Sequence, residues 1–211
     1  MSQEIKIGVL AVQGDFEAHG RILEGLDAKP VWVRRHDELA GVEGVILPGG
    51  ESTTMLKFLE EEGLESTLRE FAARGGAIFG TCAGAILLAR EVSNPPQHSL
   101  GLLDAEVSRN GYGRQIASAV RYEVTSLKDE PMEMVFIRAP IIESVGPSVE
   151  VLASLGGKPV LVRQQNILAA TFHPELTADT TVHALFLRMA AARRREQGKV
   201  NVAVAPRKSR A

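Results

Sequence analysis

The stretch Ala77-Ile78-Phe79-Gly80-Thr81-Cys82-Ala83-Gly84 contains the only cysteine of the chain, placed between two glycines. An apolar run ends at Phe79, and Ala83 opens a helix-like segment that continues to Ala89. This order predicts a strand, a sharp turn and a helix, because small residues on either side of the turn let the strand and the helix pass close together. The start of the helix would lie behind the sulfur, where its backbone N–H groups favour a thiolate.

The position of Cys82 is typical of a nucleophile. The backbone N–H of Ala83 would be placed to donate to an oxyanion formed on a substrate carbonyl carbon. The alternative is that Cys82 is a small buried hydrophobic residue, as most isolated cysteines are. This stretch alone leaves both interpretations open.

Apolar runs and helical periodicity alternate through the first half of the chain. Runs expected to be strands lie at 5–12, 30–34, 42–47 and 77–79, and helical spacing is found at 16–26, 53–62 and 64–74. Strands that alternate with helices of this length need crossover connections, which produce a parallel sheet covered by helices on both faces. We therefore expect a single-domain α/β three-layer sandwich with a mostly parallel central sheet, and a ligand site at the carboxyl ends of its strands.

The second half of the chain does not alternate apolar runs with long helical segments. From Glu106 onward the apolar runs, at 118–124, 134–137, 149–155, 160–163 and 167–171, are short and lack long helices between them. They predict mixed or antiparallel additions to the sheet. A last helix is expected from Asp179 to about Arg195. The domain would occupy residues 1–197, and residues 198–211 are expected to form a basic, disordered tail.

Composition limits the classes of function. The 211 residues are 45% hydrophobic and carry a formal net charge of −2, which gives no overall attraction to nucleic acid or to a membrane surface. A single cysteine excludes an internal disulfide, and the first residues lack the basic and apolar regions of a signal peptide. No apolar run approaches the about 20 residues that a membrane helix needs. These features favour a cytoplasmic protein that acts on small molecules.

A reactive cysteine needs a base, and His173 is the best candidate among the histidines. It follows the apolar run 167–171, and a carboxylate, Glu175, stands two residues later. In extended backbone these two side chains point to the same side, so Glu175 could orient the imidazole and stabilise its protonated form. The alternative is a surface loop with an unrelated histidine and glutamate. The remaining histidines are expected to be surface or packing residues: His19, His36, His98 and His183.

A glycine-rich turn, Pro48-Gly49-Gly50-Glu51-Ser52, follows another expected strand. Its glycines would let backbone N–H groups approach a ligand, and Ser52 is expected to cap the next helix. A Walker-type phosphate loop is excluded because no Gly-Lys-Ser/Thr follows, and Glu51 suits a substrate ammonium better. Arg109, or Arg114 after it, could bind a carboxylate, although either arginine alone is more often part of a surface salt bridge. Together these groups indicate a pocket for an α-amino acid.

Five motifs in this order resemble a known family. They are Pro48-Gly49-Gly50-Glu51-Ser52-Thr53-Thr54, Gly80-Thr81-Cys82-Ala83-Gly84, Arg109-Asn110 to Gly113-Arg114-Gln115, Phe136-Ile137-Arg138-Ala139-Pro140 and Phe172-His173-Pro174-Glu175-Leu176-Thr177. The chain resembles the class I (triad) glutamine amidotransferases and, more narrowly, the glutaminase subunits of pyridoxal 5′-phosphate synthase, from about Ile5 to Met189. Two features depart from that pattern: Gly111-Tyr112 stands where a small residue and Phe are usual, and the tail after Gly198 has no counterpart.

The resemblance implies a flavodoxin-like, class I glutamine amidotransferase fold and a hydrolysis of L-glutamine without cofactor or metal. Cys82 would be the nucleophile, His173 the base and Glu175 its orienting carboxylate. The oxyanion hole would be formed by backbone N–H groups of Gly50 and Ala83. The implied substrate-binding residues are Gly49, Gly50, Glu51, Arg109, Ile137 and Arg138.

The implied partner is a synthase subunit with a (β/α)8 barrel, which would receive the ammonia and make pyridoxal 5′-phosphate. Two alternatives stay open. A cysteine hydrolase or stress protein on a related flavodoxin-like fold would share the cysteine turn, but it would not need Glu51, Arg109 and the His-Pro-Glu run together. A catalytically silent binding module would not need all three members of the triad.

Overall fold

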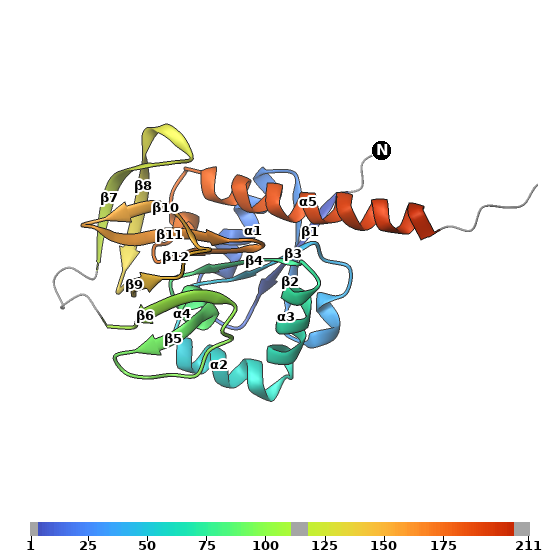
Figure 1. The fold of residues 1–211 in the computed structure, drawn as a ribbon, viewed down its shortest axis with the longest axis horizontal. Coiled ribbons are helices and arrows are strands. Elements are labelled where there is room, and N and C mark those ends of the chain that lie inside the picture. Colours follow the sequence, from blue (N-terminus) through green and yellow to red (C-terminus); the bar gives the residue numbers. More distant parts are fainter. Residues whose placement is uncertain (1–3, 111–117, 205–211) are drawn as a thin grey trace, which may run out of the picture.

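The computed structural model describes residues 4–110 and 118–204 of the chain. A nine-stranded sheet runs through its centre (Figure 1). In chain order its strands are β1 (Ile5–Leu10), β2 (Ala28–Val33), β3 (Gly44–Leu47), β4 (Ala77–Thr81), β7 (Ser118–Thr125), β8 (Lys128–Ile137), β10 (Glu150–Leu155), β11 (Lys158–Gln164) and β12 (Ile167–Ala170). Their order across the sheet is β2-β1-β3-β4-β12-β11-β10-β7-β8.

The sheet has a parallel half and an antiparallel half. The strands β2, β1, β3, β4 and β12 are parallel neighbours, whereas β11, β10, β7 and β8 are added through antiparallel pairs. Strands β3, β4 and β12 are buried along their whole length, as expected for parallel strands covered on both faces. The predicted parallel sheet and its antiparallel additions are therefore confirmed.

Helices cover both faces of the sheet and complete the three layers (Figure 1). The α-helices are α1 (Phe16–Gly25), α2 (Ser52–Glu61), α3 (Leu64–Ala73), α4 (Ala83–Leu88) and α5 (Thr181–Val204), and the short 3₁₀ helices are η1 (His36–Leu39) and η2 (Pro174–Leu176). One hydrophobic core joins the sheet to α2, α3 and α4, and a second core joins the opposite face to α1 and α5. Helices α1, α2 and α3 each bury one apolar stripe, which is why their periodicity was visible in the sequence, whereas α4 is buried at every residue.

A second, three-stranded sheet was not predicted. It consists of β5 (Ala89–Ser93), β6 (Leu103–Ser108) and β9 (Ile141–Val145), in the order β5-β6-β9. The sequence from Ala83 to Ala89 reads as one helix, but α4 ends at Leu88 and the chain continues directly into β5. The pairing of β6 with β9 joins segments far apart in the sequence, so no local pattern indicates it.

The last helix is longer than the sequence predicted. Helix α5 continues to Val204, so the boundary expected between residues 197 and 198 does not mark the end of the helix. Alanine, arginine, glutamate, glutamine and lysine between 190 and 199 favour a helix, and a glycine at 198 opposes it by only about 1 kcal/mol. Residues 205–211 of the expected tail lie outside the described residues. In the described part of the chain, no helix combines the length and the apolar character that a membrane crossing requires.

Candidate active site

Cys82 lies in the turn between β4 and α4, as predicted. Its backbone has φ 48° and ψ −103°, a left-handed conformation that is rare for a residue with a side chain. The Cys82 N–H donates to the carbonyl oxygen of Ala170 at 2.8 Å, so the neighbouring strand β12 holds the turn in place. Such a strained backbone at the end of a buried strand is characteristic of functional turns.

The two glycines around Cys82 allow this close packing. A Cβ atom on Gly80 would lie 2.6 Å from the backbone of Gly84, and one on Gly84 would lie 1.9 Å from the carbonyl oxygen of Leu47. Any side chain at these positions would therefore push α4 away from β3 and β4. The prediction that small residues let the strand and helix pass close together is confirmed.

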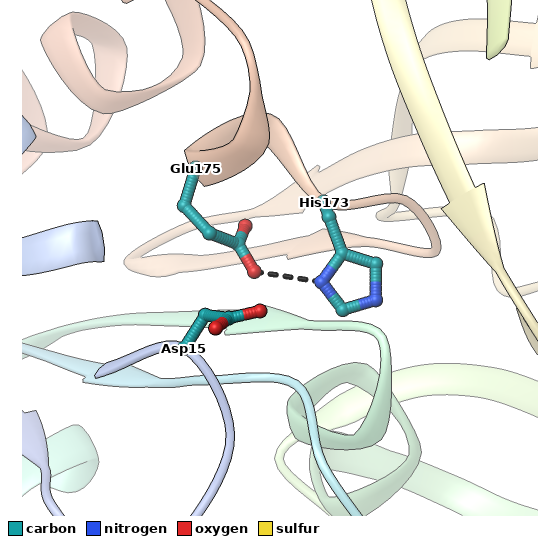
Figure 2. A group of neighbouring side chains, drawn as sticks. All are labelled: Asp15, His173 and Glu175. Carbon is teal, nitrogen blue, oxygen red and sulfur yellow. Dashed lines mark hydrogen bonds and ion pairs between the residues drawn. The ribbon is translucent and has the colours of Figure 1, made fainter. Parts of the chain in front are cut away.

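His173 and Glu175 follow β12, at the carboxyl end of the strand beside β4. The two side chains point toward each other, and His173 Nδ1 lies 2.7 Å from Glu175 Oε1 (Figure 2). Because a carboxylate only accepts hydrogen bonds, Nδ1 carries the proton and donates it, which leaves Nε2 free to act as a base. Cys82, His173 and Glu175 are each 6 or 7% exposed. The structure thus places the three predicted catalytic residues together in one buried cluster.

The electrostatic environment favours a positive charge on His173. Burial alone would lower the pKa of this imidazole, but the hydrogen bonds and the negative charges of Cys82 and Glu175 raise it to about 10. The imidazole is therefore suited to take the thiol proton and hold it beside a thiolate. This is the proton transfer that activates a cysteine nucleophile.

The glycine-rich turn between β3 and α2 lies against the imidazole. A Cβ atom on Gly49 would lie 2.4 Å from Cε1 of His173, so only glycine fits there. Gly50 has φ 145°, a conformation open mainly to glycine. On the other side, Gln13 Nε2 donates to the carbonyl oxygen of Glu51 at 2.6 Å. The predicted loop is therefore held between His173 and the turn that follows β1.

Glu51 and Arg109 are brought together beside this loop. Arg109 Nη2 lies 3.2 Å from Glu51 Oε1 and 3.0 Å from Thr53 Oγ1. The Glu51 carboxylate also accepts hydrogen bonds from the backbone N–H groups of Thr53 and Thr54 at 3.1 and 2.7 Å. Burial opposes its ionisation, but these hydrogen bonds lower the pKa of Glu51 to about 2. A substrate ammonium would therefore meet an ionised carboxylate.

The prediction that Ser52 caps α2 is wrong. Glu51 is the N-cap residue, and Ser52 is the first residue of the helix. The Ser52 hydroxyl instead donates to Gln97 Oε1 at 2.9 Å. Serine is the commoner cap in general, but the longer Glu51 side chain can fold back over two N–H groups, which frees the serine for a tertiary contact.

The backbone of Ile137 and Arg138 lies beside the sulfur. The Cys82 thiol faces the carbonyl oxygen of Ile137 at 3.9 Å. Arg138 has φ 46°, and its N–H donates to Ser118 Oγ at 3.2 Å. Ile137 ends β8 and Arg138 follows it, so the antiparallel half of the sheet supplies this wall of the site. Arg114, the alternative carboxylate ligand, and the unusual pair Gly111-Tyr112 lie outside the described residues.

Asp15 is a further neighbour of the triad. Its place before the helical stretch 16–26 predicts an N-cap residue, and Asp15 holds that position at the start of α1, but its side chain makes no capping hydrogen bond. Figure 2 shows its carboxylate next to His173 and Glu175, with ligand atoms of the three residues within 4.8 Å of one another. Such spacing could suit a metal ion, yet the hydrogen bond between His173 and Glu175 already accounts for their proximity. Nothing in the local sequence distinguishes Asp15 from an ordinary N-cap residue.

The expectation that His19 and His183 are surface or packing residues is incomplete. Both are fully buried, and His19 lies 3.5 Å from the Glu175 carboxylate.

The site as a whole offers a nucleophile, a base with an orienting carboxylate, and glycine-rich backbone next to the base. This combination can carry out acyl transfer from an amide or ester through a thioester.

Comparisons with known proteins agree with this chemistry. Residues 9–192 match the model of the SNO glutamine amidotransferase family. A relative from Koribacter versatilis, a pyridoxal 5′-phosphate synthase subunit PdxT, is 58% identical over 185 residues, which cover 88% of this chain and 95% of the relative. A second PdxT, from Kosmotoga olearia, is 52% identical over 186 residues, covering 87% of this chain and 97% of the relative.

A solved structure supports the same assignment. The crystal structure of a glutamine amidotransferase has a TM-score of 0.81 and 47% sequence identity to this chain, and the match covers 88% of this chain and 98% of that one. The family match covers residues 9–192 and the structural match covers 88% of the chain, and the cysteine turn lies within both. This chain therefore belongs to the SNO glutamine amidotransferase family.

Proposed function

We propose that this chain is the glutaminase subunit of a pyridoxal 5′-phosphate synthase, which hydrolyses L-glutamine to L-glutamate and ammonia. The observation that carries this proposal is the position of Cys82 at a strained turn beside the hydrogen-bonded pair His173 and Glu175. The family match and the names of the relatives support the same reaction and the same pathway.

The reaction uses the three side chains in turn. His173 takes the thiol proton, and the thiolate of Cys82 attacks the carbon of the glutamine side-chain amide. The tetrahedral intermediate collapses to a glutamyl thioester as His173 gives its proton to the departing ammonia. A water molecule, deprotonated by His173, then attacks the thioester and releases glutamate and the thiol. Glu175 keeps Nδ1 of His173 protonated throughout, so that Nε2 performs each transfer.

The oxyanion formed in both steps needs donors. We assign these to the backbone N–H groups of Ala83 and Gly50. Ala83 begins α4 directly after the nucleophile, so its N–H belongs to the first turn of a helix, which has no intrahelical acceptor. Gly50 lies in the loop that packs against His173 through Gly49. Each oxyanion donor of this kind contributes about 2.7 to 4 kcal/mol to transition-state stabilisation.

The amino-acid head of glutamine would lie between Glu51 and Arg109. The ionised Glu51 carboxylate suits the substrate ammonium, and the Arg109 guanidinium suits the substrate carboxylate. Gly49 and the backbone of Ile137 and Arg138 would line the path from this head to the sulfur. The two ionic side chains are paired with each other in the structure, so glutamine would exchange a protein ion pair for two ion pairs with the substrate.

The ammonia would pass to a synthase partner that contains a (β/α)8 barrel, in the cytoplasm.

The decisive experiment measures glutamate release from L-glutamine by the purified chain, with and without that synthase subunit, for wild type and Cys82→Ala. The proposal requires turnover by the wild type in the complex and none by the variant. Absence of turnover under both conditions would favour a silent binding module, whereas hydrolysis of simple esters but not glutamine would favour a general cysteine hydrolase.

A further inference from the structure

His19 occupies a buried position directly behind the triad. It lies in α1 and is fully buried. Its Nε2 is 3.5 Å from Oε2 of Glu175 and 3.3 Å from Oγ1 of Thr81, the residue before the nucleophile. Its Nδ1 is 2.9 Å from Nε2 of His183, which comes from α5. His19 therefore connects the orienting carboxylate to two other elements of the core.

The Glu175 carboxylate needs a second donor. Its Oε1 accepts the hydrogen bond from His173, but its Oε2 is buried and accepts no hydrogen bond. An ionised carboxylate oxygen buried without a donor is costly, and the carboxylate would be free to rotate away from His173. His19 Nε2 lies 3.5 Å from this oxygen and makes its hydrogen bond to Thr81 Oγ1 at 3.3 Å. A proton on Nε2 would stabilise the anion there.

The hydrogen bond between the two buried histidines decides where that proton is. One ring nitrogen must donate and the other must accept. If His19 Nδ1 donated, its Nε2 would present a lone pair to the Glu175 anion, and the buried Nδ1 of His183, which has no partner, would carry an unsatisfied N–H. If His183 Nε2 donates, both problems disappear. His19 Nδ1 then accepts, its Nε2 carries a proton near both Thr81 Oγ1 and Glu175 Oε2, and Nδ1 of His183 carries no proton.

Both histidines are neutral in this arrangement. Burial, followed by the charges of His183 and His173, lowers the pKa of His19 well below its ordinary value, and burial lowers that of His183 to about 4. A neutral N–H dipole stabilises Glu175 without placing a second positive charge near His173. A cation at that position would oppose the imidazolium that the reaction needs.

We propose that His19 is a positioning residue that acts through Glu175, and that His183 fixes the tautomer of His19. This inference rests on the proposed function, because it assigns to His19 the task of keeping the Glu175 carboxylate aimed at His173. The chain of contacts runs from Cys82 through His173 and Glu175 to His19 and His183.

A pair of variants distinguishes the roles of the two ring nitrogens of His19. In His19→Gln the side-chain amide N–H reaches the position of Nε2, whereas in His19→Asn the amide reaches only the position of Nδ1. By analogy with the outer-shell groups that orient metal ligands, we expect His19→Asn to lower kcat for glutamine about 10- to 100-fold. The glutamine KM should change by less than about twofold, because substrate binding is not involved. His19→Gln should recover most of the lost kcat.

A purely structural role predicts a different result. The two variants would then lose thermal stability and activity together, and His19→Gln would be no more active than His19→Asn. Equal kcat values in His19→Asn and the wild type would also overturn the proposal.

Nitrogen NMR of the unmodified chain tests the inference even if neither variant folds. With ¹⁵N-labelled histidine, the spectrum shows which ring nitrogens carry protons. The proposal requires both buried histidines to be neutral and protonated on Nε2 near neutral pH, and a proton on Nδ1 of His19 would refute it. This readout does not depend on turnover. If the chain with its synthase subunit did not hydrolyse glutamine but showed the expected tautomers, only the proposed function would be rejected. If the enzyme were active but showed the wrong tautomer, only this inference would be rejected.

Discussion

The two sides of the site are built differently. The triad side, Cys82, His173 and Glu175, follows two adjacent parallel strands and is almost fully buried. The recognition side is formed by Glu51 and Arg109, whose side chains are 53 and 18% exposed, and by the end of β8 in the antiparallel half. The candidate bond-making groups thus lie in short turns directly after buried strands, and the groups suited to bind the substrate lie on loops and at a strand end. Changes on the triad side should alter kcat, and changes on the recognition side should alter KM.

The largest effect is expected for the nucleophile and the base. Cys82→Ala should abolish glutaminase activity, and His173→Asn should nearly do so, because no thioester forms without the activated thiolate. Both variants should still bind glutamine, which calorimetry on the complex with the synthase would detect. Retained turnover in Cys82→Ala would eliminate the covalent mechanism.

Glu175→Gln should have the next largest effect. The amide can no longer stabilise the imidazolium or fix the tautomer of His173, so kcat should fall on the order of a thousandfold or more, as in serine triads that lose this carboxylate. The free energy of unfolding, measured with denaturant, should show that the variant folds. A decrease in kcat of less than about threefold would mean that Glu175 does not orient the base.

Docking of the partner should change the rate of glutamine hydrolysis through the loop at Gly49 and Gly50, which lies between the two sides. The peptide between Gly49 and Gly50 can rotate with little steric cost, and Gly50 already has φ 145°. If the partner turns this N–H toward the oxyanion, the free chain should hydrolyse glutamine about 10²- to 10³-fold more slowly than the complex, the effect of one oxyanion donor. Equal kcat values with and without the synthase subunit would reject this mechanism and leave the triad assignment intact.

On the recognition side, Arg109→Ala should raise the glutamine KM with little change in kcat. Because Arg109 is partly buried and already shares its charge with Glu51, we expect a loss at the lower end of the range for charged contacts, about 2 kcal/mol or about 30-fold. Steady-state kinetics with the complex would measure it. An unchanged KM would show that another group, with Arg114 the first to test, holds the substrate carboxylate.

The smallest effect concerns the cap that Glu51 forms on α2. Its pKa is about 2 in the folded chain and 4.5 as its ordinary value, so its ionised form stabilises the fold. This contribution is fully present above pH 4.5 and is lost as the pH falls toward 2. Glu51→Gln should therefore be less stable than wild type near pH 7, and the difference should shrink between these two values. A difference in unfolding free energy that is independent of pH would mean that the carboxylate charge does not matter to the cap.

Much of this architecture was accessible from sequence because its signals are local. The alternation of apolar runs and helical stripes predicted the parallel half of the sheet, and Gly80 and Gly84 around Cys82 predicted the strained turn. His173 and Glu175 were paired correctly because they are two residues apart and share one side of the chain. In each case the side chains that determine the geometry lie within a few residues of one another.

Other features depended on tertiary structure. The sheet β5-β6-β9, the capping role of Glu51 in place of Ser52, and the approach of Asp15 to His173 arise from contacts between distant segments. His19 is the clearest example, because its partner His183 is 164 residues away and both become buried only when α1 and α5 pack on the same face of the sheet. The sequence by itself determined which residues could do chemistry, since that depends on residue type and local backbone. Packing decided which buried groups surround them, because burial and proximity are properties of the whole fold.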